Sequence, residues 1–222
     1  MDQINQEFFD AAARGDFAKV CANVAKGANV NVANGDGRTA LMRSAKRGYE
    51  DIVRFLLDNG ADARARDKNN KTALMSAAKK GHLNICRLLV HAGADVNSHD
   101  DKGRTALMRA AFLGQYDVVE YLVGKGANID AADSEGRTAL MEAVIAYKVE
   151  VIDYLLTKGA NVNAADNRGC TALMRAAYSG YRELIADLLA KGADKEKLDN
   201  EGNKAIHYVR KEVFEELKDL LK

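Results

Sequence analysis

The stretch Gly103-Arg104-Thr105-Ala106-Leu107-Met108 recurs along the whole chain. The same six residues begin at Gly37 and again at Gly136, and related forms begin at positions 70, 169 and 202. Each start lies 33 residues after the previous one, and a fixed period of this length is typical of proteins built by stacking short repeats. The sequence therefore predicts a stack of similar units.

Glycine is confined to set positions within this period. If units begin at residues 1, 34, 67, 100, 133, 166 and 199, then 16 of the 18 glycines fall at the fourth, fifteenth or twenty-seventh position of a unit. A glycine kept at one position predicts a positive φ or a close approach of two backbones there. Asn70 fills the one gap at the fourth position, and asparagine tolerates a positive φ better than most side chains do.

Two short helical patterns lie between the glycines of each unit. In the unit that begins at Asp100, the first spans residues 105 to about 113 and the second residues 116 to about 125, with apolar side chains spaced for one buried face. Thr105 is the expected N-cap, and Gly114 is expected to end the first helix. The polar segment before the next unit is expected to form a β-turn finger. Such a unit cannot bury its apolar faces alone, so the units must stack.

Three motifs recur with the repeat. They are Asp-x-x-Gly-x-Thr at residues 133–138, Ala-Ala-x-x-Gly at residues 176–180, and Gly-Ala-Asn/Asp-Val-Asn at residues 93–97 and 159–163. With these motifs the chain resembles the ankyrin repeat over nearly its whole length. The resemblance implies an all-α fold: an ankyrin-repeat solenoid of helix-turn-helix units with β-turn fingers, and a concave face formed by the first helices and the turn tips.

We expect one ankyrin-repeat domain over residues 1–222. It comprises an N-terminal capping repeat over residues 1–33, five full repeats over residues 34–198 and a C-terminal capping repeat over residues 199–222. In the first unit Phe8 and Phe9 take the place of Leu-Met, and polar residues supply an outer face. Residues 209–221 are expected to form a charged amphipathic helix.

One departure from the family pattern is systematic, because Thr-Ala-Leu-Met replaces the usual Thr-Pro-Leu-His and the chain contains no proline. The resulting methionine column is interpreted as core packing between units, in preference to a soft binding stripe. Its members are Met42, Met75, Met108, Met141 and Met174.

Tyr147 is a second departure, since it stands where other units have glycine at the fifteenth position. A tyrosine held at positive φ would cost about 1–3 kcal/mol, so we expect the local turn to be reshaped. The alternative interpretation is an aromatic hot spot on the binding face.

The sequence contains no pattern that indicates catalysis. It lacks a phosphate-binding loop, G-x-S-x-G and H-E-x-x-H, and its four histidines occupy different positions of the unit. Cys86 falls in a column of buried valines and isoleucine, whereas Cys170 is expected to be exposed on a turn tip with no base beside it. We therefore predict no enzyme, no cofactor and no metal site.

Charge and hydropathy give the expected location. The start of the chain does not resemble a signal peptide, and no apolar run approaches the roughly 18 residues of a membrane helix. Three widely spaced cysteines indicate neither a disulfide framework nor a metal site. We expect a cytoplasmic protein, or one secreted into a host cytoplasm if it is an effector.

The predicted binding surface consists of the variable positions on the turn tips and first helices. The N-terminal half should present a basic patch and the C-terminal half an apolar one, which agrees with net charges of +5 for residues 1–111 and −4 for residues 112–222 (18 − 13 and 15 − 19). Basic residues at the fifth position have an alternative interpretation as part of the scaffold. The candidate partner-binding residues are Arg38, Arg43, Lys46, Arg47, Lys71, Lys79, Lys80, Arg104, Arg109, Phe112, Leu113, Arg137, Glu142, Ile145, Tyr147 and Tyr178.

These features favour a non-enzymatic protein–protein interaction module. It would bind, on its concave face, a protein with an acidic segment beside apolar anchors, and would itself be a monomer. The alternatives are a regulatory or accessory subunit that controls a partner enzyme, and the recognition domain of a larger effector. Nucleic acid is disfavoured by the net charge of +1 and by the lack of a basic, aromatic groove, and nothing indicates a membrane surface.

Overall fold

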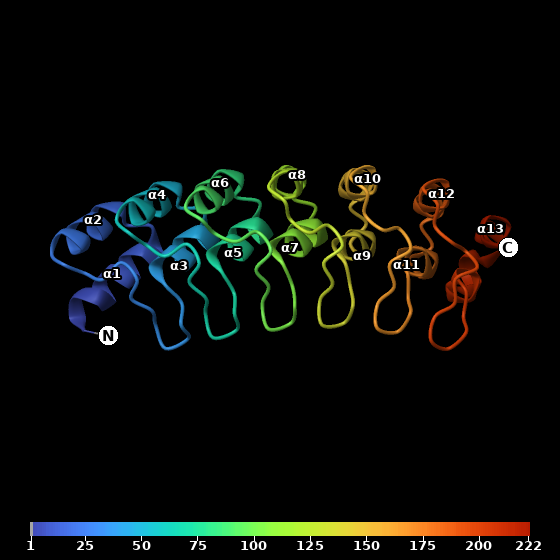
Figure 1. Ribbon diagram of the computed structural model, residues 1–222, viewed down its shortest axis with the longest axis horizontal. Helices are drawn as coiled ribbons and strands as arrows, with labels where there is room; N and C mark the ends of the chain where they lie inside the picture. Colours follow the sequence, from blue (N-terminus) through green and yellow to red (C-terminus); the bar gives the residue numbers. More distant parts are fainter. Residues whose placement is uncertain (1) are drawn as a thin grey trace.

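The computed structural model describes residues 2–222, and in this range it is all-α, with three isolated β-bridges and no strand. The predicted fold class is confirmed (Figure 1). The elements are α1 (Gln3–Arg14), α2 (Phe17–Ala25), α3 (Ala40–Arg47), α4 (Glu50–Asp58), α5 (Ala73–Lys80), α6 (Leu83–His91), α7 (Ala106–Leu113), α8 (Tyr116–Gly124), α9 (Ala139–Ile145), α10 (Val149–Thr157), α11 (Ala172–Ser179), α12 (Arg182–Ala190), the 3-10 turns η1 (Ala205–Tyr208) and η2 (Lys211–Val213), and α13 (Phe214–Leu221).

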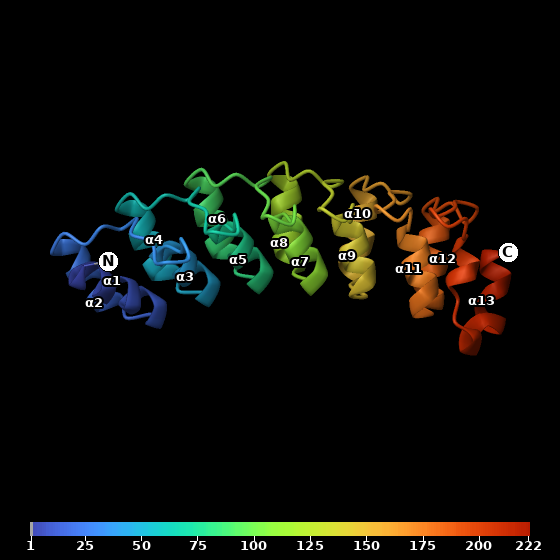
Figure 2. The ribbon, with the colours of Figure 1, turned by 90° about the horizontal axis from the view of Figure 1, so that it is seen from below.

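The helices form two rows. The first helices of the units, α1 to α11 with odd numbers, form one row, and the second helices, α2 to α12 with even numbers, form a second row above it in the view of Figure 1. The β-turn fingers project from the side of the first row. Seen from below, the stack follows a shallow arc (Figure 2). We call the surface made by the first helices and the fingers the inner face.

The helix ends follow the sequence closely. Thr105 Oγ1 accepts a hydrogen bond from the amide of Met108 at 3.3 Å, and the equivalent threonine caps α3, α5, α9 and α11. Gly114 ends α7 with a φ of 72°. Helices of this length are marginal in isolation, so packing between units must supply most of their stability.

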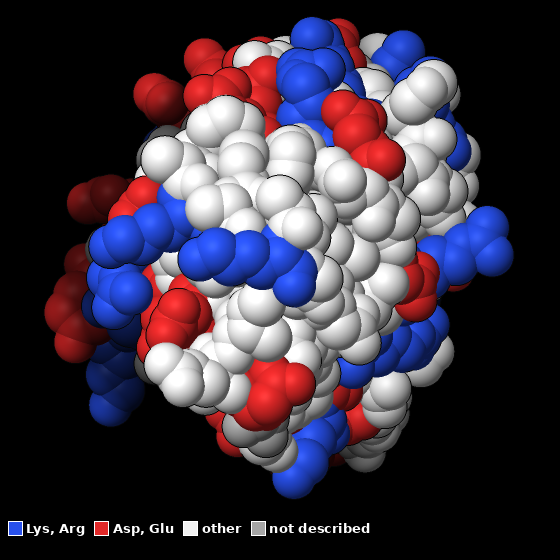
Figure 3. Space-filling view, turned by 90° about the vertical axis from the view of Figure 1, so that its left-hand side faces the viewer, with Lys and Arg blue, Asp and Glu red and all other residues white. Residues whose placement is uncertain are grey.

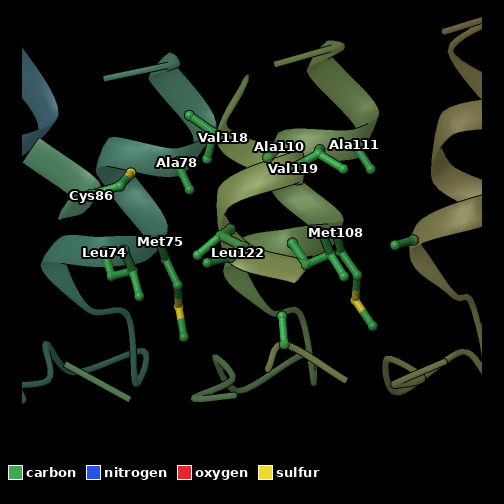
Figure 4. Packing of buried hydrophobic residues seen from close by; sticks show 14 of the residues in the cluster. Leu74, Met75, Ala78, Cys86, Met108, Ala110, Ala111, Val118, Val119 and Leu122 are labelled. Carbon is green, nitrogen blue, oxygen red and sulfur yellow. The ribbon is translucent and has the colours of Figure 1, made fainter. Parts of the chain in front are cut away.

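The core runs through the stack between the two rows (Figure 4). Met75 and Met108 occupy the same place in successive units and are buried, as are the other three methionines of the column. The prediction that this column packs in the core is confirmed. Cys86 is also buried, and burial raises the pKa of its thiol to about 12, so it is not a nucleophile at neutral pH.

Backbone hydrogen bonds link each finger to the next. The amide of Ser134 donates to the carbonyl of Lys102 at 2.9 Å. At Gly103, φ is 71° and an added Cβ would lie 2.9 Å from the Cα of Asp133, so both expected reasons for glycine apply there. Asn70, which fills the gap in this column, adopts a φ of 57° as predicted.

The prediction of a reshaped turn at Tyr147 is wrong. Tyr147 keeps a positive φ of 52°. Its amide donates to Val144 O at 3.1 Å, and that of Lys148 donates to Ala143 O at 2.9 Å, the same pattern that surrounds Gly114. Stacking of the Tyr147 ring on Tyr181, with centroids 4.1 Å apart, supports this conformation.

The predicted exposure of Cys170 is also wrong. The residue is 4% exposed, because the last unit folds η1 over it and places Tyr208 Oη 3.0 Å from its sulfur. The amphipathic helix near the C-terminus is shorter than predicted. Val209 and Arg210 have extended backbones, and the α-helix begins only at Phe214.

At the N-terminal end of the stack, uncharged side chains cover most of the surface (Figure 3). Lys, Arg, Asp and Glu are interspersed around them, and neither sign dominates this view.

Candidate partner-binding face

The structure places all sixteen predicted residues on the first helices, on the turns that follow them and on the finger segments that precede them. They differ in accessibility. Those on the last turn of a first helix or just beyond it are exposed: Lys46, Arg47, Lys79, Lys80, Phe112, Leu113, Ile145, Tyr147 and Tyr178. Those at the fifth and tenth positions are half-buried: Arg38, Arg43, Lys71, Arg104, Arg109, Arg137 and Glu142.

Asp100 explains why the half-buried arginines of its unit are not free. One carboxylate oxygen accepts from the amides of Lys102 and Arg104 at 2.9 and 3.0 Å, which shapes the finger. The other faces the guanidinium groups of Arg104, at 3.1 Å, and Arg109. Burial alone would raise the pKa of the Asp100 carboxyl, but these hydrogen bonds and the charge of Arg109 hold it below its ordinary value.

The same contact recurs between the first and tenth positions of other units. Arg175 donates to Asp166, and in the last unit the hydroxyl of Tyr208 donates to Asp199. The hydrogen bond from Tyr208, together with those from Asn203 and the amide of Glu201, lowers the pKa of the Asp199 carboxyl to about 2. We call this contact between positions one and ten the clasp.

Two adjacent units lack the clasp. Asn34 replaces the first carboxylate, so Arg43 at position ten has no anion in its own unit. In the next unit Asp67 is present but Ser76 occupies position ten. Asp67 instead receives Arg38 from the neighbouring finger at 3.5 Å.

A hollow of about 300 Å³ lies where these two clasps are missing. Seven Lys or Arg side chains and one carboxylate, Asp67, line it together with Met42, Thr72, Met75 and Ser76. Among residues 2–222, only Arg38 and Arg109 of the seven form ion pairs. We call this site the basic hollow; its cations are Arg38, Arg43, Lys46, Lys71, Lys79, Lys80 and Arg109.

The ammonium group of Lys79 lies close to several other positive charges in the basic hollow. Partial burial, together with the positive charges of Arg109, Lys80, Arg104 and Lys46, lowers the pKa of its ammonium group below the ordinary value. The folded protein thus holds like charges close together. An anion bound in the basic hollow would relieve that repulsion.

The unit 133–165 carries a third arrangement at position ten. Arg137 lies between two carboxylates, 2.9 Å from Asp133 and 3.3 Å from Glu142. Burial raises the pKa of the Glu142 carboxyl in spite of the nearby arginine. Arg104 and Arg137 therefore both bind turn carboxylates, which favours the scaffold interpretation of basic residues at the fifth position.

Exposed apolar side chains follow the basic hollow along the inner face. Tyr178 is 62% exposed, and the others are at least 36% exposed. Val149, which the sequence analysis did not select, is also exposed, at the start of α10. We call this set the apolar strip: Phe112, Leu113, Ile145, Tyr147, Val149 and Tyr178.

The sequence analysis missed the three residues that create the basic hollow: Asn34, Asp67 and Ser76. Their signal was available in the repeat. Units with Asp at position one and Arg at position ten occur twice, and Asn34 with Arg43 and Asp67 with Ser76 depart from that pairing in opposite ways. These departures can be interpreted only once the contact between positions one and ten is known from the structure.

Within residues 2–222, no three His, Cys, Asp or Glu side chains lie close enough together to hold a metal ion. None of the described helices has the length and apolar character needed to cross a bilayer.

Comparison with known proteins agrees with the repeat architecture. Residues 8–100 and 130–199 match the model described as ankyrin repeats (3 copies), and residues 102–134 match the model described as ankyrin repeat. The crystal structure of the ankyrin repeat domain of Bcl-3, a unique member of the IkappaB protein family, superposes with a TM-score of 0.82 at 27% identity, covering 96% of this chain and 97% of that one. No curated protein matches in sequence. Ankyrin-repeat domains are typically interaction modules and are usually non-enzymatic, and this chain belongs to the ankyrin-repeat family.

Proposed function

We propose that the protein is a non-enzymatic interaction module that binds a protein partner on its inner face. The observation that supports this is the placement of the basic hollow directly beside the apolar strip. An exposed apolar patch next to charged groups is characteristic of protein interfaces. The complementary partner carries an acidic group next to apolar anchors.

We further propose that residues 1–222 form one ankyrin-repeat domain that acts as a monomer. Each unit contributes the same few positions to the inner face, so the binding surface extends along the stack. Two of the three cysteines are buried and poorly placed for catalysis. Cys86 is buried with a raised thiol pKa, and Cys170 lies beneath Tyr208.

Affinity capture from a lysate of the source organism tests this proposal. The bait would be compared with a variant carrying Lys79→Glu and Phe112→Ala, which alters both the basic hollow and the apolar strip. The matched control is Lys125→Glu, the same charge reversal at an exposed position after α8, on the second row of helices. A protein retained by the wild type and the control but lost by the variant supports the proposal. Identical captures by all three baits would contradict it.

A further inference from the structure

The chemistry of the basic hollow defines the anion that it accepts, provided that the inner face binds a partner as proposed above. Five of its cations, those of Arg43, Lys46, Lys71, Lys79 and Lys80, have no carboxylate within ion-pair distance in the described structure. They come from two adjacent units and face one concavity. A single group can therefore contact several of them at once.

A carboxylate does not match this site well. It carries one negative charge and two oxygens, and the units that do have a carboxylate here already satisfy it with one or two arginines. A phosphate monoester carries nearly two negative charges at pH 7 and presents three strong acceptor oxygens. Its charge and its acceptors suit several cations that converge on one point.

Size and neighbourhood restrict the source of the phosphate. The hollow of about 300 Å³ has the volume of about ten waters, room for one phosphoryl group and part of its carrier. Nucleic acid would present a row of phosphates, yet the inner face continues from the basic hollow into the apolar strip. Apolar contacts beside a single phosphate suit a peptide better than a polynucleotide.

We propose that the basic hollow binds a phosphorylated serine or threonine side chain of the protein partner. The guanidinium of Arg43 and the ammonium groups of Lys46, Lys79 and Lys80 hold the phosphoryl oxygens. Phe112 and the rest of the apolar strip take apolar residues near the phosphorylated one. Phosphorylation of the partner thereby controls the interaction.

The test is a titration of the isotope-labelled protein, observed by NMR, with N-acetyl-phosphoserine amide. Parallel titrations use N-acetyl-glutamate amide, inorganic phosphate and a short oligothymidylate. We expect saturable shifts at the amides of Ser76 and Lys79, with the phosphoserine compound binding about tenfold more tightly than the glutamate compound. Equal affinity for glutamate, or shifts spread over the whole surface, would overturn the proposal.

Ser76→Arg separates a specific pocket from general electrostatic attraction. The new guanidinium fills the basic hollow and reaches Asp67, as Arg109 reaches Asp100, while the protein gains one positive charge. The proposal expects phosphoserine affinity to fall about tenfold despite that gain. Tighter binding by this variant would mean that net charge alone determines the affinity. The control variant Lys125→Glu should leave the phosphoserine affinity within about twofold of the wild type.

The remaining probes distinguish the sources of phosphate. Inorganic phosphate should shift the same two amides but bind more weakly than the phosphoserine compound; equal affinity would mean that the basic hollow takes free phosphate and not a phosphorylated side chain. Tighter binding of oligothymidylate than of phosphoserine, with a steep salt dependence, would replace the peptide by a nucleic acid. If phosphoserine fails while partner capture still depends on Lys79 and Phe112, the partner supplies carboxylates, and only the phosphate proposal is lost.

Discussion

The neighbouring units 67–99 and 100–132 share nearly every scaffold feature and differ in the partners of their first-position aspartates. Thr72 and Thr105 cap equivalent helices, Met75 and Met108 fill equivalent places in the core, and both fingers are closed by a first-position aspartate. At position ten one unit has Ser76 and the other Arg109. Unit 67–99 therefore contributes to the basic hollow, whereas in unit 100–132 Arg109 pairs with the carboxylate of Asp100.

This difference shows how the stack separates folding from recognition. The caps, the glycine turns and the buried face of α5 do not involve position ten, so its side chain can change without disturbing the helix. Position ten nevertheless decides whether the finger carboxylate is neutralised internally or the surrounding cations remain available.

Removal of either first-position aspartate should cause the largest loss in the free energy of unfolding, and the two losses should differ. Asp67→Ala and Asp100→Ala both lose two hydrogen bonds from finger amides and one ion pair with a fifth-position arginine, Arg38 or Arg104. Only Asp100→Ala also leaves Arg109, whose side chain is 12% exposed, without its anion. We expect a loss of about 4 kcal/mol for Asp100→Ala and about 2 kcal/mol for Asp67→Ala. Urea denaturation followed by circular dichroism measures both. Equal losses would mean that the clasp adds nothing to the finger.

Tyr147 extends the comparison to position fifteen, where unit 100–132 has Gly114. Replacement by glycine relieves a left-handed backbone but also removes the stack on Tyr181. In a Tyr181→Ala background the stack is already absent, so Tyr147→Gly should then stabilise the protein by about 1–2 kcal/mol. In the wild-type background the gain should be smaller by about 1 kcal/mol. A double-mutant cycle in urea checks this, and equal gains would show that the two rings do not interact.

The parts of the structure that follow from the sequence are those set by the repeat itself. Thr105, Gly114 and Met108 could be assigned because each belongs to a column with one physical role, and columns average out individual exceptions. The exceptions were harder. Tyr147 keeps the glycine conformation because a ring from the next unit supports it, and that contact lies 34 residues away in the sequence.

The binding face could be predicted as a set of positions but not as a set of free charges. Whether Arg109 is available depends on Asp100, nine residues earlier, and no short-range pattern makes that contact evident. Cys170 was misjudged for a related reason. Its position on a finger predicts exposure, but the shortened last unit covers it with Tyr208.

An arginine at position ten should form the clasp in unit 67–99 and stabilise it. Ser76→Arg supplies Asp67 with a guanidinium Nη donor of the kind that Arg109 gives Asp100, and we expect a gain of about 1 kcal/mol. Ser76→Lys is the matched control, because an ammonium group is more strongly hydrated than a guanidinium and should give less. The midpoints of urea denaturation of the two variants and the wild type measure these differences in stability. If arginine destabilises the protein, the geometry of unit 100–132 does not transfer to its neighbour.

The last unit offers the mildest form of the comparison, since Tyr208 gives its clasp a neutral donor. The pKa of Asp199 is lowered from 3.8 to about 2, so its contribution to stability is present above about pH 4 and is lost as the pH falls towards 2. Tyr208→Phe removes the donor and should return the pKa of Asp199 towards its ordinary value. The variant should therefore be less stable than the wild type at pH 7, with the difference vanishing near pH 2. Carboxyl NMR titration of Asp199, with urea denaturation across the same pH range, measures both effects. A pKa that stays near 2 in the variant would assign the shift to the finger amides of Glu201 and Asn203 rather than to the clasp.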